Sequence, residues 1–211
     1  RTFSYDLLNM TMVYQTAFII FLSTAINFVN CEVKVARAIL LTETINGTII
    51  FTETEHGVRV AGSITGLPVG LYGFHVHEIG DVSTCDAVGA HFNPEGSNHG
   101  GRDHSVRHVG DLGNVQFANE VAGVPVAYVN FMDTMIALNG TNNIIGRTLV
   151  LHEQEDDLGL GGHETSLTTG NAGTRVACAI ITEVPENNSV GNITPSLLMC
   201  VLTTLLMYTS L

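Results

Sequence analysis

Two histidines, His75 and His77, stand two positions apart in the run Gly73–Glu78, GFHVHE. The β-rich pattern of this run predicts a strand. Alternation along a strand sends Phe74 and Val76 to the core face and both histidines to the opposite face. Two imidazoles on one strand face can reach a single metal ion. The pair is weak evidence alone, because two exposed histidines give the same pattern.

More candidate ligands follow at short spacings. His91, His99 and His108 lie eight and nine residues apart in a glycine-rich segment. Asp111 comes three residues after the last of them, and His152 ends a later β-rich run. Imidazole-rich sites suit copper and zinc. The pattern therefore predicts that six of the nine histidines and one aspartate are metal ligands.

Short β-rich runs separated by turn signals predict the scaffold for these residues. Apolar residues in Val58–Thr65 alternate with polar or small ones, as in a half-buried strand. No convincing amphipathic helix is present in the sequence, so the pattern favours an all-β antiparallel sandwich or flattened barrel. The eight predicted strands are Glu32–Leu41, Gly47–Thr54, Val58–Thr65, Tyr72–Glu78, Asn114–Phe117, Val126–Phe131, Thr148–His152 and Arg175–Thr182.

Two long segments, Gly80–Gly113 and Glu153–Thr174, have no strand pattern. Structureless segments longer than about 15 residues are uncommon in compact domains and are usually functional. Most of the histidines and aspartates of the chain lie in or beside these two segments. We therefore expect two long functional loops.

The charge balance restricts the partners of the protein. Eight Lys and Arg residues stand against 20 Asp and Glu residues, which gives a net charge of −12 at pH 7. Such a surface repels phosphate backbones, which argues against nucleic-acid binding. Nearly all of the charged residues fall within residues 31–186, which we interpret as a single domain.

Residues 1–30 are interpreted as a leader. The apolar run at residues 17–29 is too short to span a bilayer comfortably and has the length of a signal-peptide hydrophobic region. The alternative is a buried first strand or helix of the domain. The signal-peptide pattern favours secretion.

Residues 187–211 are interpreted as a spacer and a hydrophobic tail. They carry no charged side chain and include the apolar run Ser196–Leu211. An apolar tail after a spacer with small residues is typical of a glycosylphosphatidylinositol (GPI) anchor signal. A short tail anchor or a docked terminal helix is the alternative. We predict an extracellular glycoprotein, either secreted or attached to the outer cell surface. Its glycosylation sequons begin at Asn46, Asn139, Asn187 and Asn192.

Six motifs together resemble those of copper/zinc superoxide dismutase, over roughly residues 32–183. This resemblance implies an eight-stranded antiparallel Greek-key barrel with an immunoglobulin-like sandwich architecture. The motifs are GFHVHEIGD (73–81), GAHFNPEG (89–96), RHVGDLGNV (107–115), IIGRTLVLHE (144–153), DDLGLGG (156–162) and GNAGTRVACAI (170–180).

The resemblance also implies one copper ion and one zinc ion per chain. Four imidazoles accommodate both cupric and cuprous copper, and three imidazoles with one carboxylate give zinc a closed shell of four ligands. One histidine bridges the two ions. The implied copper ligands are His75, His77, His91 and His152. The implied zinc ligands are His91, His99, His108 and Asp111.

Further residues match functional positions of the family. Asp156 matches a carboxylate that links a copper-ligand histidine, here His75, to a zinc-ligand histidine, here His99. Arg175 matches the active-site arginine, which holds the substrate anion beside copper. The resemblance thus implies that one carboxylate orients ligands in both metal sites.

Of the four cysteines, Cys31 stands at the expected mature N-terminus and Cys200 in the apolar tail, which leaves Cys85 and Cys178. This pair matches the intrasubunit disulfide of the family. A disulfide is consistent with export to an oxidising compartment. The remaining histidines, His56, His104 and His163, match no ligand position. We interpret them as ordinary surface histidines.

Two departures from the family pattern affect assembly and substrate attraction. The loop between Asp81 and Cys85 is one residue shorter than usual, and Ala90 replaces a frequent proline. Because this loop lies at the dimer interface of the family, the implied homodimer has an altered contact region. Thr168 and Gln154 stand where lysines that attract the anion are frequent, so we expect weaker steering.

The implied activity is the conversion of two superoxide anions and two protons to dioxygen and hydrogen peroxide, an antioxidant oxidoreductase function. The implied catalytic residues are His91, which supplies a proton, and Arg175, which holds the anion. The alternative is a non-enzymatic copper/zinc-binding protein, a metal buffer, on the same fold. The enzyme is favoured because all implied ligands and the arginine are present.

Overall fold

The computed structural model describes residues 33–185 of the chain. The predicted leader and the predicted tail lie outside the described residues, as do the sequons at Asn187 and Asn192. Within residues 33–185, no helix combines the length and the apolar character that a membrane span requires.

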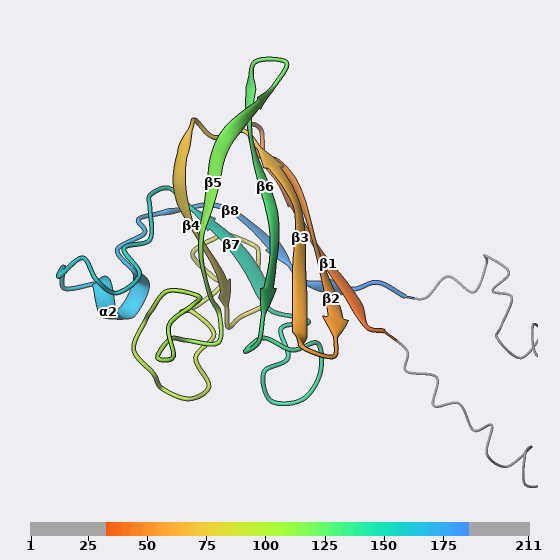
Figure 1. Cartoon of the computed structure of the whole chain (residues 1–211), viewed down its shortest axis with the longest axis vertical. Helices are drawn as coiled ribbons and strands as arrows, with labels where there is room; N and C mark the ends of the chain where they lie inside the picture. Colours follow the sequence, from red (N-terminus) through yellow and green to blue (C-terminus); the bar gives the residue numbers. More distant parts are fainter. Residues whose placement is uncertain (1–32, 186–211) are drawn as a thin grey trace, which may run out of the picture. The chain divides into compact units, whose positions relative to one another are not determined.

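Within this range the chain forms one antiparallel sheet of nine strands, in the order β8-β7-β4-β5-β6-β3-β2-β1-β9 (Figure 1). The pairing of β3 with β6 and of β4 with β7 joins strands that are not consecutive, as a Greek-key barrel requires. The predicted all-β antiparallel fold is confirmed. The strands are β1 Val35–Leu41, β2 Asn46–Thr54, β3 Gly57–Thr65, β4 Gly70–His77, β5 Asp111–Val121, β6 Val124–Asp133, β7 Thr148–His152, β8 Arg175–Ile180 and β9 Thr182–Glu183.

The strand count differs from the expected eight by one, because the predicted last strand is divided at Ile181. Its first part, β8, pairs with β7, whereas β9 pairs with β1 on the opposite edge of the sheet. At the division, the Ile181 N–H donates to the Arg147 carbonyl oxygen and the Gly146 N–H donates to the Ile181 carbonyl oxygen. The last segment therefore exchanges partners and brings the two edges of the sheet together.

Alternation along the strands builds the core. In β1, Ala36, Ala38 and Leu40 are fully buried, whereas Ile39 and Leu41 on the other face are exposed. The same inward face continues on the neighbouring strands. The largest fully buried apolar side chains include Leu40, Ile49, Phe51, Ile64, Phe74, Phe117, Leu149 and Leu151. The sequence pattern of half-buried strands is thus realised as a filled barrel interior.

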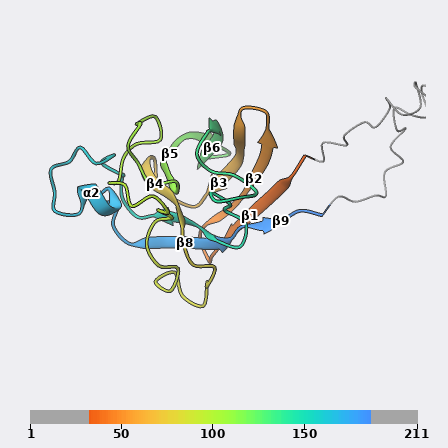
Figure 2. The same cartoon turned by 90° about the horizontal axis from the view of Figure 1, so that it is seen from below.

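Both predicted long loops are present, and both views place them on the side of the sheet formed by β4, β7 and β8 (Figures 1 and 2). The first loop connects β4 to β5, and the second connects β7 to β8 and contains the short helix α2, Ser166–Thr169. A disulfide between Cys85 and Cys178 joins the first loop to β8. The predicted disulfide is therefore present.

Candidate metal centre

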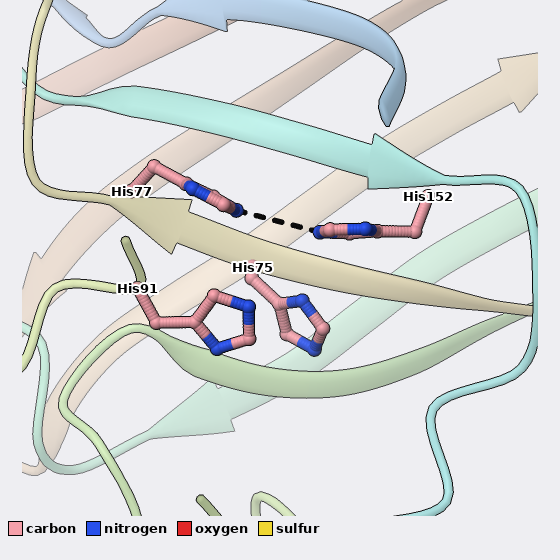
Figure 3. Close-up of side chains that lie close together, drawn as sticks. All are labelled: His75, His77, His91 and His152. Atoms are coloured by element: carbon pink, nitrogen blue, oxygen red, sulfur yellow. Dashed lines mark hydrogen bonds between the residues drawn. The ribbon is translucent and has the colours of Figure 1, made fainter. Parts of the chain in front are cut away.

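Four histidines from three elements, His75, His77, His91 and His152, meet beside β4 (Figure 3). We call them the copper cluster, after the metal that the resemblance implies for them. β4 supplies the first two, the first loop supplies the third, and the end of β7 supplies the fourth. Each offers a ring nitrogen, and these nitrogens all lie within 4.8 Å of one another. All four side chains are buried. The expected core face of β4 holds Phe74 and Val76, and the opposite face is covered by the loops.

Hydrogen bonds fix which ring nitrogen of two copper-cluster histidines carries a proton. His77 Nδ1–H donates to the Gly89 carbonyl oxygen (2.9 Å), and His152 Nδ1–H donates to the Gly173 carbonyl oxygen (3.2 Å). Because a carbonyl only accepts, the neutral rings have unprotonated Nε2 atoms. These two Nε2 atoms face each other at 3.4 Å, as Figure 3 shows. Two opposed lone pairs repel each other, and a cation between them removes the repulsion.

The other two nitrogens of the copper cluster are buried without a partner. His75 donates from Nε2 to Asp156 Oδ2 (2.8 Å), which leaves Nδ1 as a lone pair. Neither His75 Nδ1 nor His91 Nε2 has a hydrogen-bond partner among the described residues. Buried polar atoms without partners are rare in native proteins, and a metal ion is a partner that suits these nitrogens. The donor set therefore fits a copper ion held by four imidazoles.

Burial keeps these rings in the form that binds metal. Burial and the charge of His91 lower the pKa of His75 and of His77 far below the ordinary value. Burial likewise lowers the pKa of His91, and burial with the charge of His91 lowers that of His152 to about 4. All four imidazoles are then neutral at pH 7, as metal ligands must be.

A second group, His91, His99, His108 and Asp111, shares His91 with the copper cluster. We call it the zinc cluster, after the metal that the resemblance implies for it. The Nδ1 atoms of the three histidines lie 2.8, 3.0 and 3.1 Å from the same oxygen, Asp111 Oδ1. His99 Nδ1 makes no hydrogen bond to that oxygen in spite of the 3.0 Å distance. Three nitrogens and one oxygen in mutual contact match the four ligands of a tetrahedral zinc site.

The second oxygen of Asp111 is held by the backbone. Asp111 Oδ2 accepts from the Gly100 N–H (3.1 Å) and the His108 N–H (2.8 Å). Burial raises the pKa of Asp111, but the hydrogen bonds from His108 and His91 and the contact with His99 lower it more, to well below the ordinary value. The side chain is therefore an anion with one oxygen fixed and the other turned toward the three imidazoles.

His99 differs in the direction of its pKa shift from the four histidines of the copper cluster. Burial lowers its pKa, but the contact with the Asp111 carboxylate and the hydrogen bond to Asp156 outweigh burial and raise the pKa to about 9. The ring is therefore positive at pH 7 before a metal binds. A cation at this cluster must displace one proton, which couples metal affinity to pH.

Asp156 connects the two clusters, as the resemblance implied. Its Oδ2 accepts from His75 Nε2 and its Oδ1 accepts from His99 Nε2, both at 2.8 Å. Asn114 of β5 holds the backbone of Asp156 through two reciprocal hydrogen bonds of 2.8 Å. The close group of His75, His99 and Asp156 is therefore explained as a link that orients two ligands.

Backbone contacts bring the first loop against β4. The Val76 N–H donates to the Gly110 carbonyl oxygen, and the Phe92 N–H donates to the Val76 carbonyl oxygen, both at 2.8 Å. A side chain at Gly110 would collide with the Val76 carbonyl oxygen, so only glycine permits this approach. His91 and Asp111 are the neighbours of these residues in the chain. The contacts therefore place them beside the histidines of β4.

Arg175 begins β8, opposite His152 in the register of β7 and β8. Its Nη1 donates to the carbonyl oxygens of Cys85 (3.0 Å) and Asp86 (3.1 Å), and its Nη2 donates to that of Gly89 (2.6 Å). The Gly89 carbonyl oxygen also accepts from the copper-cluster residue His77. One carbonyl group of the first loop thus accepts hydrogen bonds from both the arginine and a candidate copper ligand.

Sequence reasoning assigned no role to several residues that support the site. The buried Arg107 donates to the buried Asp133 at 2.7 Å, and to the carbonyl oxygens of His108 and Asp111. The sequence did hold a signal for Arg107, because this arginine directly precedes a candidate ligand in a chain with few basic residues. Asn114 gave no such signal.

The three histidines interpreted as surface residues, His56, His104 and His163, are exposed and belong to neither cluster.

We predict that Gly170→Ala weakens zinc binding by 10- to 100-fold, as is typical when a residue that orients a ligand is displaced. A Cβ at Gly170 collides with Asp156 Oδ1 and His99 Nε2. Gly162→Ala is the matched control, because Gly162 has a similar φ, 69° against 65°, and has no atom within 4 Å of that Cβ. Zinc affinity is measured by competition with a chelator. Equal losses in both variants would attribute the effect to backbone strain instead.

Comparisons with known proteins agree with this geometry. The family model for copper/zinc superoxide dismutase matches residues 45–181. Superoxide dismutase [Cu-Zn] 4 of Dictyostelium discoideum is 53% identical over 143 residues, which cover 66% of this chain and 92% of that protein.

A solved structure, described as that of the clock protein EA4, is 51% identical with a TM-score of 0.67, and the match covers 70% of this chain and 93% of that one. The family match spans more than half of the chain, and the relative is similar over almost its whole length. The chain belongs to the copper/zinc superoxide dismutase family.

Proposed function

We propose that this superoxide dismutase holds copper in the cluster of four histidines and zinc in the cluster of three histidines and Asp111. The observation that carries the assignment is the set of buried ring nitrogens that face one another without hydrogen-bond partners among the described residues. Copper bound there supplies one-electron redox chemistry, and zinc supplies a fixed positive charge that organises its ligands. The protein converts two superoxide anions and two protons to dioxygen and hydrogen peroxide.

Arg175 holds the substrate anion in this proposal. A guanidinium has five N–H donors, and three hydrogen bonds to carbonyl oxygens use three of them. Two donors are then left for an anion, on a side chain that is partly exposed and beside His152. Fixed donors of this kind stabilise negative charge without reorganisation.

His91 carries the proton in this proposal. Its Nδ1 faces Asp111 in the zinc cluster, and its Nε2 faces the copper cluster without a partner among the described residues. Nε2 is therefore the atom at which a proton is taken up and passed to the reduced substrate. The zinc cluster keeps the ring in place while this proton moves.

We predict that Arg175→Ala lowers kcat/KM by roughly 10- to 100-fold, the range expected for loss of hydrogen bonds to a charged group. Copper and zinc contents are measured on the same sample. The same assay on His152→Ala should show loss of both copper and turnover. Full activity in Arg175→Ala with both metals bound would contradict the role of the arginine. Metal binding without turnover in the unaltered protein would instead support the metal-buffer alternative.

Attraction of the anion is predicted to be weak, because Thr168 and Gln154 replace frequent lysines. Thr168 is exposed in α2 of the second loop. We predict that Thr168→Lys raises the rate at low salt and steepens its decrease with added salt, since mobile ions screen the new charge. Ser63→Lys on the outer face of β3 adds the same charge far from β7 in the sheet order. An equal gain in both variants would show that only net charge matters.

The location of the enzyme is proposed as extracellular, at the outer cell surface. The Cys85–Cys178 disulfide supports this, since disulfides persist in oxidising compartments. The apolar composition of residues 17–29 and 196–211 supports a signal peptide and a GPI signal. Homodimer formation stays a prediction, as does glycosylation at the exposed Asn46 and Asn139.

We predict that phosphatidylinositol-specific phospholipase C releases dismutase activity from intact cells that express the full chain. Truncation after residue 187 should send active enzyme into the medium, because His152 and Arg175 precede the cut. Activity that stays on the cells after lipase treatment but is released by detergent would indicate a retained membrane tail. Activity free in the medium from the full-length gene would indicate simple secretion.

A further inference from the structure

An open pocket of about 500 Å³ lies between the first long loop and the end of β6. The loop contributes Arg102, His104, Ser105 and Arg107 to its lining, and the β6 end contributes Asp133 and Thr134. No ligand of either metal cluster lines it. The pocket is therefore separate from the site that carries out dismutation.

The buried side of the pocket is formed by Arg107, which is 3% exposed. Its Nη2 donates to Asp133 Oδ2 at 2.7 Å, and its Nη1 donates to three backbone carbonyl oxygens. Its Nε–H is buried and has no hydrogen-bond partner among residues 33–185. The guanidinium thus offers one more donor than its surroundings accept, which favours an acceptor nearby.

The carboxylates of the pocket do not supply that acceptor. Asp133 Oδ1 already accepts from the N–H groups of Met135 (2.8 Å) and Ile136 (3.0 Å), and Oδ2 is occupied by Arg107. The Asp103 side chain is 89% exposed and lies 3.7 Å from Arg102 Nε. The acceptors at this surface are therefore either used or turned toward water.

The remaining polar groups of the pocket are donors. The Arg102 guanidinium lies over the Phe131 ring at 4.2 Å and makes no hydrogen bond within the described part of the chain. His104 Nδ1 accepts from the Gly101 N–H at 3.1 Å, so the proton of the neutral ring is on Nε2. The hydroxyls of Ser105 and Thr134 likewise have no partner within that part of the chain.

We propose that this pocket binds a tetrahedral oxyanion, a phosphate or sulfate group, either free or as part of a monoester. An oxyanion offers several acceptor oxygens to the donors of Arg102, His104, Ser105 and Thr134. With Asp133 paired to Arg107, the exposed Asp103 carboxylate is the one remaining charged group of the lining that is not a donor. Arg102, His104, Ser105 and Thr134 bind it from the rim, and the Arg107 guanidinium, paired with Asp133, lies below them. Arg107 also donates to the carbonyl oxygens of His108 and Asp111. The bound anion therefore lies next to the arginine that fixes the backbone of two zinc-cluster residues.

The test is a titration of the reduced, copper- and zinc-loaded holoenzyme followed by ¹H–¹⁵N NMR at constant ionic strength. Inorganic phosphate, inorganic sulfate and glucose 6-phosphate are the three probes. We expect saturable shifts of the amides of residues 102–105 and 133–135 with at least one probe. Tighter binding of glucose 6-phosphate than of phosphate identifies a monoester as the ligand, and the reverse identifies the free anion.

Arg102→Gln should weaken this binding by at least about tenfold, the effect of losing one hydrogen bond to a charged group. Arg59→Gln is the matched control, because it removes one exposed guanidinium from the outer face of β3. The double variant Ser105→Ala/Thr134→Val repeats the test at exposed positions if Arg102→Gln unfolds. The proposal is overturned by shifts that do not saturate, by shifts confined to residues around Arg175, or by equal losses in the Arg102 and Arg59 variants.

Discussion

The structure depends on one constraint, which is that several imidazole nitrogens are buried together with their lone pairs facing one another. A buried polar atom without a partner costs free energy, and a group of such atoms costs more because the low dielectric strengthens their repulsion. His75 Nδ1 and His91 Nε2 have no partner among the described residues, and the Nε2 atoms of His77 and His152 oppose each other. Metal ions remove this cost. Folding and metal binding are therefore thermodynamically coupled.

The remaining contacts make sure that only the metal-facing nitrogens are left without partners. In four of the six candidate-ligand histidines the second ring nitrogen donates to a fixed acceptor, which is a backbone carbonyl for His77 and His152 and Asp156 for His75 and His99. These bonds set both the tautomer and the ring orientation. The acceptors in turn belong to loops that are tied to strands, through the disulfide, Asn114 and Gly110. The long loops are thus held firmly at the points where they meet the metal site.

The sequence predicted the barrel and the two groups of candidate ligands that the structure brings close together, since strand alternation and the family motifs are local properties. Placement of His91 and Asp111 beside β4 needed the resemblance, because no local pattern says where a long loop folds back. The division of the last strand at Ile181 was not predictable, because alternation gives no information about the partner strand. The crowding of Gly170 against Asp156 and His99 is a three-dimensional contact between residues far apart in the chain.

The positions of the few basic residues determine how this acidic protein attracts an anionic substrate. Three guanidiniums hold loop backbone instead of lying free on the surface. Arg107 donates to backbone carbonyls at the end of the first loop and the start of β5, and Arg175 donates to backbone carbonyls of the first loop near Cys85. Arg147 stacks on the Phe92 ring at 3.5 Å and donates to the Glu78 carbonyl oxygen at 2.8 Å. Arg175 alone of these three pairs with His152 of the copper cluster in the sheet register, so we propose that attraction of superoxide is short-ranged and concentrated at this arginine.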